Sequence, residues 1–164
     1  MNDRRLEEVL RHLQPPAGTR LWHGGATALG ALRGVTPEVA VWKPYPDRHS
    51  IWELALHVAY WNYAVRRRVT GEATGGFPRS PADWPDLPAH RTPATWKADR
   101  GLVREAHDRL VKVLRDFDRS RLDDDPGGSG RTTFADLITG IVLHDTYHAG
   151  QIQMLKRLAR SHGL

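Results

Sequence analysis

Apolar side chains recur at alternating steps of three and four along the last part of the chain, which is the spacing of one face of an α-helix. The predicted inward positions of this helix are Phe134, Leu137, Ile141, His144, His148, Gln151, Leu155 and Leu158. Thr132 or Thr133 is placed to cap its start, and the helix is expected to run to about Leu158. Two imidazoles, those of His144 and His148, therefore take inward positions one turn apart.

A second strong helix is predicted to begin at Ser50, where the sequence Ser-Ile-Trp-Glu forms a capping box. In this motif the side chains of Ser50 and Glu53 each accept from the other residue's backbone amide, and the cap is favoured for Glu53 over a ligand or base role. The helix is expected to end before Gly71. Its inward positions are Leu54, His57, Trp61 and Ala64 or Val65.

The first 50 residues predict short, interrupted helices. A first helix over Asn2–Leu13 ends at Pro15-Pro16, because proline cannot continue a hydrogen-bonded helix. A second piece, interrupted by glycines, stops near Gly34. The stretch Val35–His49 carries three prolines and is expected to lack regular helix. His23, beside tryptophan and glycine, is open to a site role, although a packing or surface position is favoured.

A third long helix opens at Thr92-Pro93, with a threonine cap and proline at the first helical position. Its predicted inward positions are Val103, Ala106, Leu110, Val113 and Phe117. His107 falls one step off this stripe and is expected to be exposed. The preceding stretch Gly71–Pro93 holds five prolines, and loops of this length cross a fold or cover a site. Trp84 or Phe77 is therefore expected near the mouth of a pocket.

Length and composition narrow the function classes. The 164 residues fit one domain over 1–164 and suffice to bury a core. The absence of cysteine excludes disulfides, thiolate ligands and a protein thiol nucleophile. A net charge of +5 is too small to indicate nucleic-acid binding. No apolar run approaches the ~18 residues that span a membrane and no apolar leader is present, so a cytoplasmic protein without a membrane partner is expected.

These helices predict an all-α bundle, and metal sites recur in the cores of such bundles. His57 from one helix and His144 with His148 from another supply three nitrogen ligands for a divalent ion. A single core histidine is usually a polar group whose hydrogen bonds are satisfied. Burying three unpaired imidazoles together is costly, and one shared ion would satisfy all three. Three protein ligands leave a coordination position open, as in catalytic zinc sites.

Two segments, His49–Ala59 followed by Trp61 and His144–Ile152, resemble the signature segments of the DinB/YfiT-like family. The order of helices and the position of the long loop are similar as well, so the resemblance covers nearly the whole chain. It implies a four-helix bundle with a long crossover loop between its second and third helices, and often a homodimer. Family members with assigned roles are similar to thiol-dependent transferases or isomerases, or to amide hydrolases. The metal ligands that the resemblance implies are His57, His144 and His148.

Two functions of different class follow. The first is a metal-dependent enzyme that transfers an external low-molecular-weight thiol to a small-molecule substrate, or hydrolyses the substrate with metal-activated water. The second is a non-catalytic, stress-related protein whose metal is structural. No general base is evident, because Glu53 serves its cap and Asp145 is expected to point away from the ligand face. Asp145, Tyr147 and Gln151 are the candidates for orienting the nucleophile. Zinc is the preferred ion and nickel the alternative.

Overall fold

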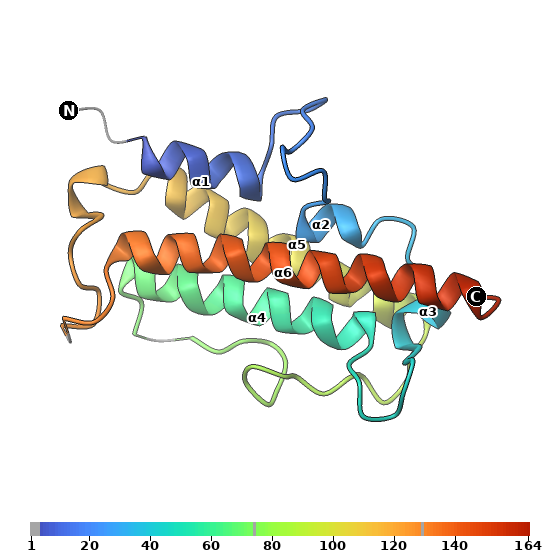
Figure 1. The fold of residues 1–164 in the computed structure, drawn as a ribbon. Coiled ribbons are helices and arrows are strands. Elements are labelled where there is room, and N and C mark those ends of the chain that lie inside the picture. The colour runs from blue at the N-terminus through green and yellow to red at the C-terminus, as the bar shows by residue number, and fades with distance from the viewer. Residues whose placement is uncertain (1–3, 74, 129) are drawn as a thin grey trace.

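Helices make up all regular structure in the residues that this computed structural model describes, 4–73, 75–128 and 130–164. The three long helices α4, α5 and α6 run lengthwise, α4 packs against both others, and α1 lies along α5 and α6 (Figure 1). The expected all-α class is confirmed. None of the described helices is long and apolar enough to cross a bilayer. The elements are α1 (Arg5–Leu13), α2 (Ala28–Ala31), α3 (Pro37–Val41), α4 (Ile51–Thr70), α5 (Pro93–Arg115), a 3-10 turn (Arg119–Arg121) and α6 (Phe134–Ser161).

Side-chain caps set the starts of the long helices, as predicted. The Glu53 amide donates to Ser50 Oγ at 3.2 Å, and the Ser50 amide donates to Glu53 Oε2 at 2.7 Å. Thr92 and Thr133 form equivalent capping boxes at the starts of α5 and α6. Gly71 closes α4 with φ 72°, a left-handed conformation that glycine adopts without steric strain. The caps fix the residue at which each long helix begins.

Pro37 begins a helix instead of preventing one. The hydroxyl of Thr36 accepts from the Val39 amide at 3.3 Å, and Pro37 occupies the first turn of α3, where its missing N–H is not needed. The prediction that residues 35–49 lack regular helix was therefore wrong for α3. This short helix packs against α4. It forms part of the connection that leads into α4.

Two apolar clusters divide the core along the long helices. One gathers around Trp52 and Trp96, and the other around Leu110 and Phe134. The first cluster takes α4 up to residue 59 and α6 from residue 149, while the second takes the opposite halves of both helices. Between the two clusters, α4 and α6 place a polar layer in the core. Its members are His57, Asn62, Asp145 and His148, with His144 half-buried beside them.

The inward face of α6 is broader than the single predicted stripe. Leu158 was expected inside but is 37% exposed, and Leu137 is only half-buried. The physical reason is that α6 packs against α4 on one side and against α1 and α2 on another, so positions beside the predicted stripe are covered as well. The additional buried positions are Ile138, Val142, Asp145, Ala149, Ile152 and Ala159.

His107 is buried, so the prediction that it is exposed was wrong. Its Nε2 lies 3.1 Å from the carbonyl oxygen of Leu13, the last residue of α1. Because α1 lies across this face of α5, a position just off the main stripe becomes interior. Val113 and Phe117, predicted inside, are half-buried, and Leu114 takes the deep position between them.

A buried carboxylate fixes the long connection between α4 and α5 to the helices. Asp99 of α5 is fully buried and accepts from Trp52 Nε1 at 2.8 Å. It also accepts from Arg79 Nη2 of the connection at 2.6 Å. The ion pair therefore ties the connection to both long helices from within. No periodic pattern in the sequence pointed to this pair, because one partner lies in an irregular segment.

Replacing Asp99 by alanine is expected to lower the free energy of unfolding by about 2–3 kcal/mol, because a buried indole N–H and a guanidinium lose their acceptor. Glu105→Ala on the same helix removes an exposed pair with Arg109 and should cost less than about 0.5 kcal/mol. Urea unfolding followed by circular dichroism measures both. Similar losses in the two variants would contradict the anchoring role of Asp99.

Candidate metal centre

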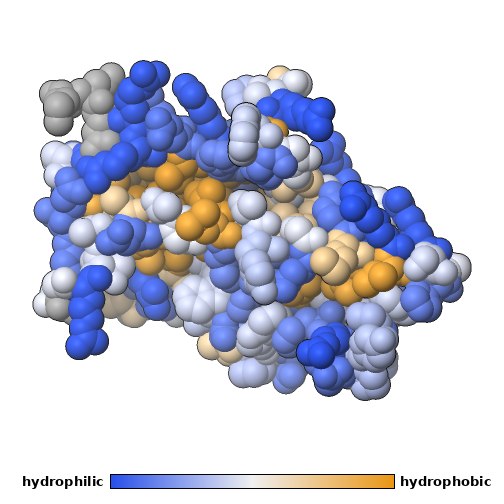
Figure 2. Space-filling view, viewed as in Figure 1, coloured by the Kyte–Doolittle hydropathy of each residue, from blue (hydrophilic) through white to orange (hydrophobic). Residues whose placement is uncertain are grey.

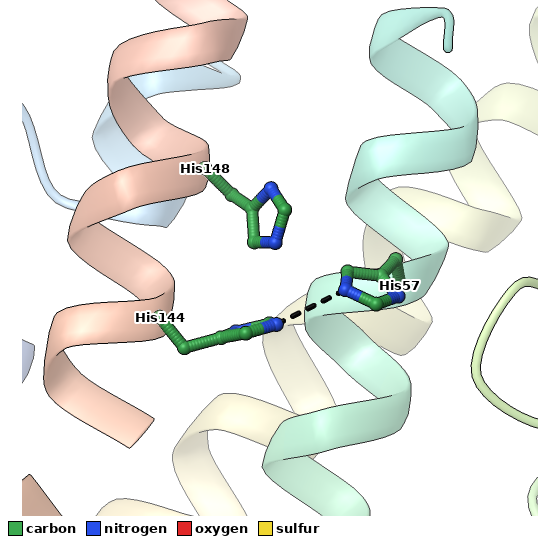
Figure 3. Close-up of side chains that lie close together, drawn as sticks. All are labelled: His57, His144 and His148. Carbon is green, nitrogen blue, oxygen red and sulfur yellow. Dashed lines mark hydrogen bonds between the residues drawn. The ribbon is translucent and has the colours of Figure 1, made fainter. Parts of the chain in front are cut away.

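The side chains of His57, His144 and His148 converge between α4 and α6 (Figure 3). Each ring offers one nitrogen, and these three nitrogens lie within 4.8 Å of one another. The closest pair is His57 Nε2 and His144 Nε2, at 3.0 Å. His57 is 6% and His148 5% exposed, while His144 is half-buried. The structure thus brings together the three histidines that the helical spacing singled out.

Neighbours within α6 orient its two imidazoles. The Nδ1–H of His148 donates to Gln151 Oε1 at 2.7 Å, which turns Nε2 toward the centre. His144 Nδ1 lies 3.5 Å from Asp145 Oδ1. Both oxygens of Asp145 accept from Asn62 Nδ2 at 3.0 Å. Asp145 was expected to point away from the ligand face. It turns inward instead and is buried, because the inward face of α6 is broad.

The long connection orients His57. The Nδ1–H of His57 donates to the carbonyl oxygen of Asp83 at 2.7 Å. The Asp83 carboxylate in turn accepts from Trp61 Nε1 at 2.6 Å. Asp83 has φ 70°, in the left-handed region where aspartate is among the more tolerated residues. Trp84, the next residue, stacks on His57 with ring centroids 3.8 Å apart, so the connection covers the site as expected.

Phe77 lies elsewhere along α4. Its ring packs against Tyr60 and Tyr63, with centroid distances of 5.7 and 5.5 Å. Of the two aromatic residues expected near the pocket, Trp84 is therefore the one that contacts the histidine cluster.

When His57 and His144 are both neutral, their hydrogen-bond roles conflict in the absence of a shared cation. His57 donates from Nδ1, so the Nε2 of the neutral ring is an acceptor. If His144 donates from Nε2 to His57, its Nδ1 carries no proton for the Asp145 carboxylate. If His144 donates to Asp145 instead, two lone pairs face each other at 3.0 Å. A cation between the two nitrogens resolves the conflict, and nitrogens that share tetrahedral zinc lie about 3.4 Å apart.

Burial keeps two of the rings neutral. Loss of solvation is the largest cause that lowers the pKa of His148, to about 4, and the neighbouring imidazoles lower it further. Loss of solvation also lowers the pKa of His57, with a contribution from His144. Neutral imidazoles keep a lone pair available at neutral pH, as metal ligation requires.

A cleft of ≈ 610 Å³ opens beside His148. Its walls are mainly apolar and aromatic and include Leu54, Trp84, Tyr147 and Met154. Tyr147 is exposed there, with its ring centroid 5.0 Å from that of His148. A second hollow of ≈ 640 Å³ is lined by other residues, from the C-terminal part of α4 and the segment before α6. Unlike this second hollow, the cleft beside His148 adjoins the histidine cluster.

Comparison with protein families matches residues 20–152 to the model of the DinB superfamily. The match covers most of the chain and contains all three histidines. The chain belongs to the DinB superfamily. No curated protein and no solved structure matches it. The resemblance noted in the two histidine-containing segments is confirmed.

Two other residues considered from the sequence lie outside the histidine cluster of this DinB-superfamily chain. Glu53 is engaged by its capping box and by Lys43 Nζ at 2.8 Å. His23 is exposed, and its Nδ1 accepts from the Gly25 amide at 3.1 Å within its own turn. Sequence reasoning also missed Asp83 and Asn62. Of these two residues, only Asp83 had a signal in the sequence, which was the length of the loop that carries it.

Acidification of the metal-free DinB-superfamily chain from pH 7 to pH 4 is expected to lower its free energy of unfolding by about 2 kcal/mol through His148. In the folded chain this ring stays neutral down to about pH 4, whereas its ordinary pKa is 6.5. The unfolded chain therefore binds more protons between these values. The free energy of unfolding decreases as the pH is lowered across that window. Urea unfolding in EDTA at several pH values measures the slope. His148→Gln should flatten it, and an unchanged slope would contradict the assignment.

Proposed function

We propose that this DinB-superfamily protein is a divalent-metal-dependent enzyme acting on a small molecule. The proposed reaction is transfer of an external low-molecular-weight thiol to the substrate, or hydrolysis of the substrate by water. The observation that carries the proposal is the set of three imidazole nitrogens within 4.8 Å of one another beside an apolar cleft. In this proposal α1, α4, α5 and α6 form a four-helix bundle. The ion is zinc, with nickel as the alternative, and its ligands are His57, His144 and His148.

A bound divalent ion would supply Lewis acidity and lower the pKa of a coordinated water or thiol. Groups of the chain itself orient the imidazole rings toward the ion site. The Asp83 carbonyl and Gln151 accept the outer N–H groups of His57 and His148, so the inner nitrogens face a common point. Three protein ligands are fewer than the four that close a structural zinc site, which supports a catalytic role.

The three residues predicted to orient the nucleophile have different roles in the proposed reaction. Asp145 and Gln151 act on the ligand rings of α6, because their side chains contact His144 and His148. Tyr147 lines the cleft and is exposed, so it is placed to contact the substrate. Since the chain has no cysteine, an attacking thiol has to come from outside.

The alternative is a non-catalytic stress-related protein in which the ion is structural. One observation favours it: the histidines join α4 to α6 between the two apolar clusters, where an ion would fasten the helices together. The cleft beside His148 supports the enzymatic function, because a purely structural ion needs no adjoining space for a substrate.

We also propose that the protein forms a homodimer, as the family resemblance implies. The exposed side of α6 supports this assembly. Leu143 is 64% exposed, and Figure 2 shows apolar surface over parts of α6 on the displayed face. Exposed apolar patches of this kind are often covered by a partner.

Zinc is expected to bind at one ion per chain, and His57→Ala, His144→Ala or His148→Ala should each weaken its affinity at least about 100-fold. Zinc should also raise the melting temperature, because the ion binds the folded chain preferentially. His144→Ala should then lower this temperature more in zinc than in EDTA. Calorimetric titration and thermal unfolding measure these effects, with His23→Ala as the matched control. Equal losses in zinc and EDTA would indicate ordinary core packing.

Turnover by the zinc- or nickel-loaded protein distinguishes the proposed functions. A panel of electrophiles is incubated with and without several low-molecular-weight thiols, and His148→Ala serves as the control. Turnover that requires metal, thiol and His148 together is expected for a thiol transferase, because the chain lacks its own thiol. Turnover without thiol would indicate a hydrolase. An absence of metal-dependent turnover under all conditions would favour the structural ion.

A further inference from the structure

A fourth imidazole, that of His49, lies in the wall of the cleft that adjoins His148. Its side chain is exposed and stacks on Trp84 with ring centroids 3.7 Å apart and planes 7° apart. Trp84 also stacks on His57, at 3.8 Å and 12°. Two nearly parallel rings cannot lie this close to one indole on the same face without overlapping. The indole of Trp84 therefore separates His49 from His57.

The two nitrogens of His49 differ in their hydrogen bonding from those of the three clustered histidines. Within the described parts of the chain, no hydrogen bond or ion pair involves the ring of His49. Each clustered ring, by contrast, has its Nδ1 near an oxygen atom and its other nitrogen near the centre. Stacking on Trp84 fixes the plane of the His49 ring and leaves both of its nitrogens available to a molecule in the cleft.

Other groups near the cleft are less suited to exchange protons with a substrate. Asp47 lies 3.6 Å from the guanidinium of Arg48, and Glu53 is engaged by its cap. The phenols of Tyr45 and Tyr147 also line the cleft. An imidazole is better matched than a phenol or a carboxylate to proton transfer near neutral pH. Of the two imidazoles that line this cleft, His148 is a proposed metal ligand, so His49 is the one left to act as a general base.

We propose that His49 transfers protons in the reaction at this cleft, an inference that rests on the proposed enzymatic function. His49 takes the proton from the water or external thiol as the oxygen or sulfur bonds to the electrophilic carbon. As the bond from that carbon to the leaving group breaks, the protonated ring returns the proton to the leaving group or to solvent. Trp84 is the positioning residue, since its indole stacks on the ring of His49.

The test uses the zinc-loaded full chain with two probes, 4-nitrophenyl acetate for hydrolysis and 1-chloro-2,4-dinitrobenzene with glutathione for thiol transfer. His49→Gln and His49→Phe keep a planar group against Trp84 but remove the imidazole. Each should lower kcat/KM for the active probe by about 10²–10⁴-fold. Zinc affinity and melting temperature should stay near the wild-type values. His90→Gln, at an exposed position of the long connection, should match wild type throughout.

Labelling with diethyl pyrocarbonate gives a readout that does not depend on activity. Peptide mass spectrometry should find His49 modified equally with and without zinc, whereas zinc should protect His57, His144 and His148. Protection of His49 by zinc, or loss of zinc binding in its variants, would make it a ligand and overturn the proposal. Wild-type turnover that persists in both variants would overturn the role of His49 alone. No zinc-dependent wild-type turnover of either probe would overturn the proposed function together with it.

Discussion

Two buried imidazoles and a third, half-buried one, all between two apolar clusters, impose the constraint on which the rest of the structure depends. A neutral ring in the core needs a partner for each nitrogen, or it destabilises the fold. Gln151 and the Asp83 carbonyl supply outer partners, but the inner nitrogens face one another, with His57 Nε2 and His144 Nε2 3.0 Å apart. The protein therefore gathers three electron pairs in a polar layer of the core that lies between two apolar clusters.

The long connection makes the stability of the fold and the geometry of the site depend on each other. Arg79 fastens this segment to Asp99 inside the helices, and four residues later Asp83 accepts from His57. Trp84 then covers the same ring. A disturbance at Asp99 is therefore expected to reach the histidine cluster through the backbone of the connection.

Local rules predicted the parts of the structure that depend on neighbouring residues in the sequence. Capping boxes such as that of Ser50 and Glu53 set the helix starts, and a three-four spacing on two such helices was enough to bring the histidines together. Tertiary packing decided what the spacing did not predict. His107 is interior only because α1 crosses it, and Asp145 is interior because α6 is covered on two sides. Asp83 acts through its backbone carbonyl, which no side-chain pattern reveals.

The hydrogen bonds divide the imidazoles around the cleft into two kinds. Rings whose outer nitrogens are held by Asp83 or Gln151 have fixed orientations, which suits ligands of an ion. The ring of His49 stacks through its face on Trp84, and this contact uses neither nitrogen. A group that exchanges protons has to change its hydrogen-bond partners during a reaction, whereas a ligand has to keep them. The indole of Trp84 supports both requirements at once, because it packs against a fixed ring on one face and an accessible ring on the other.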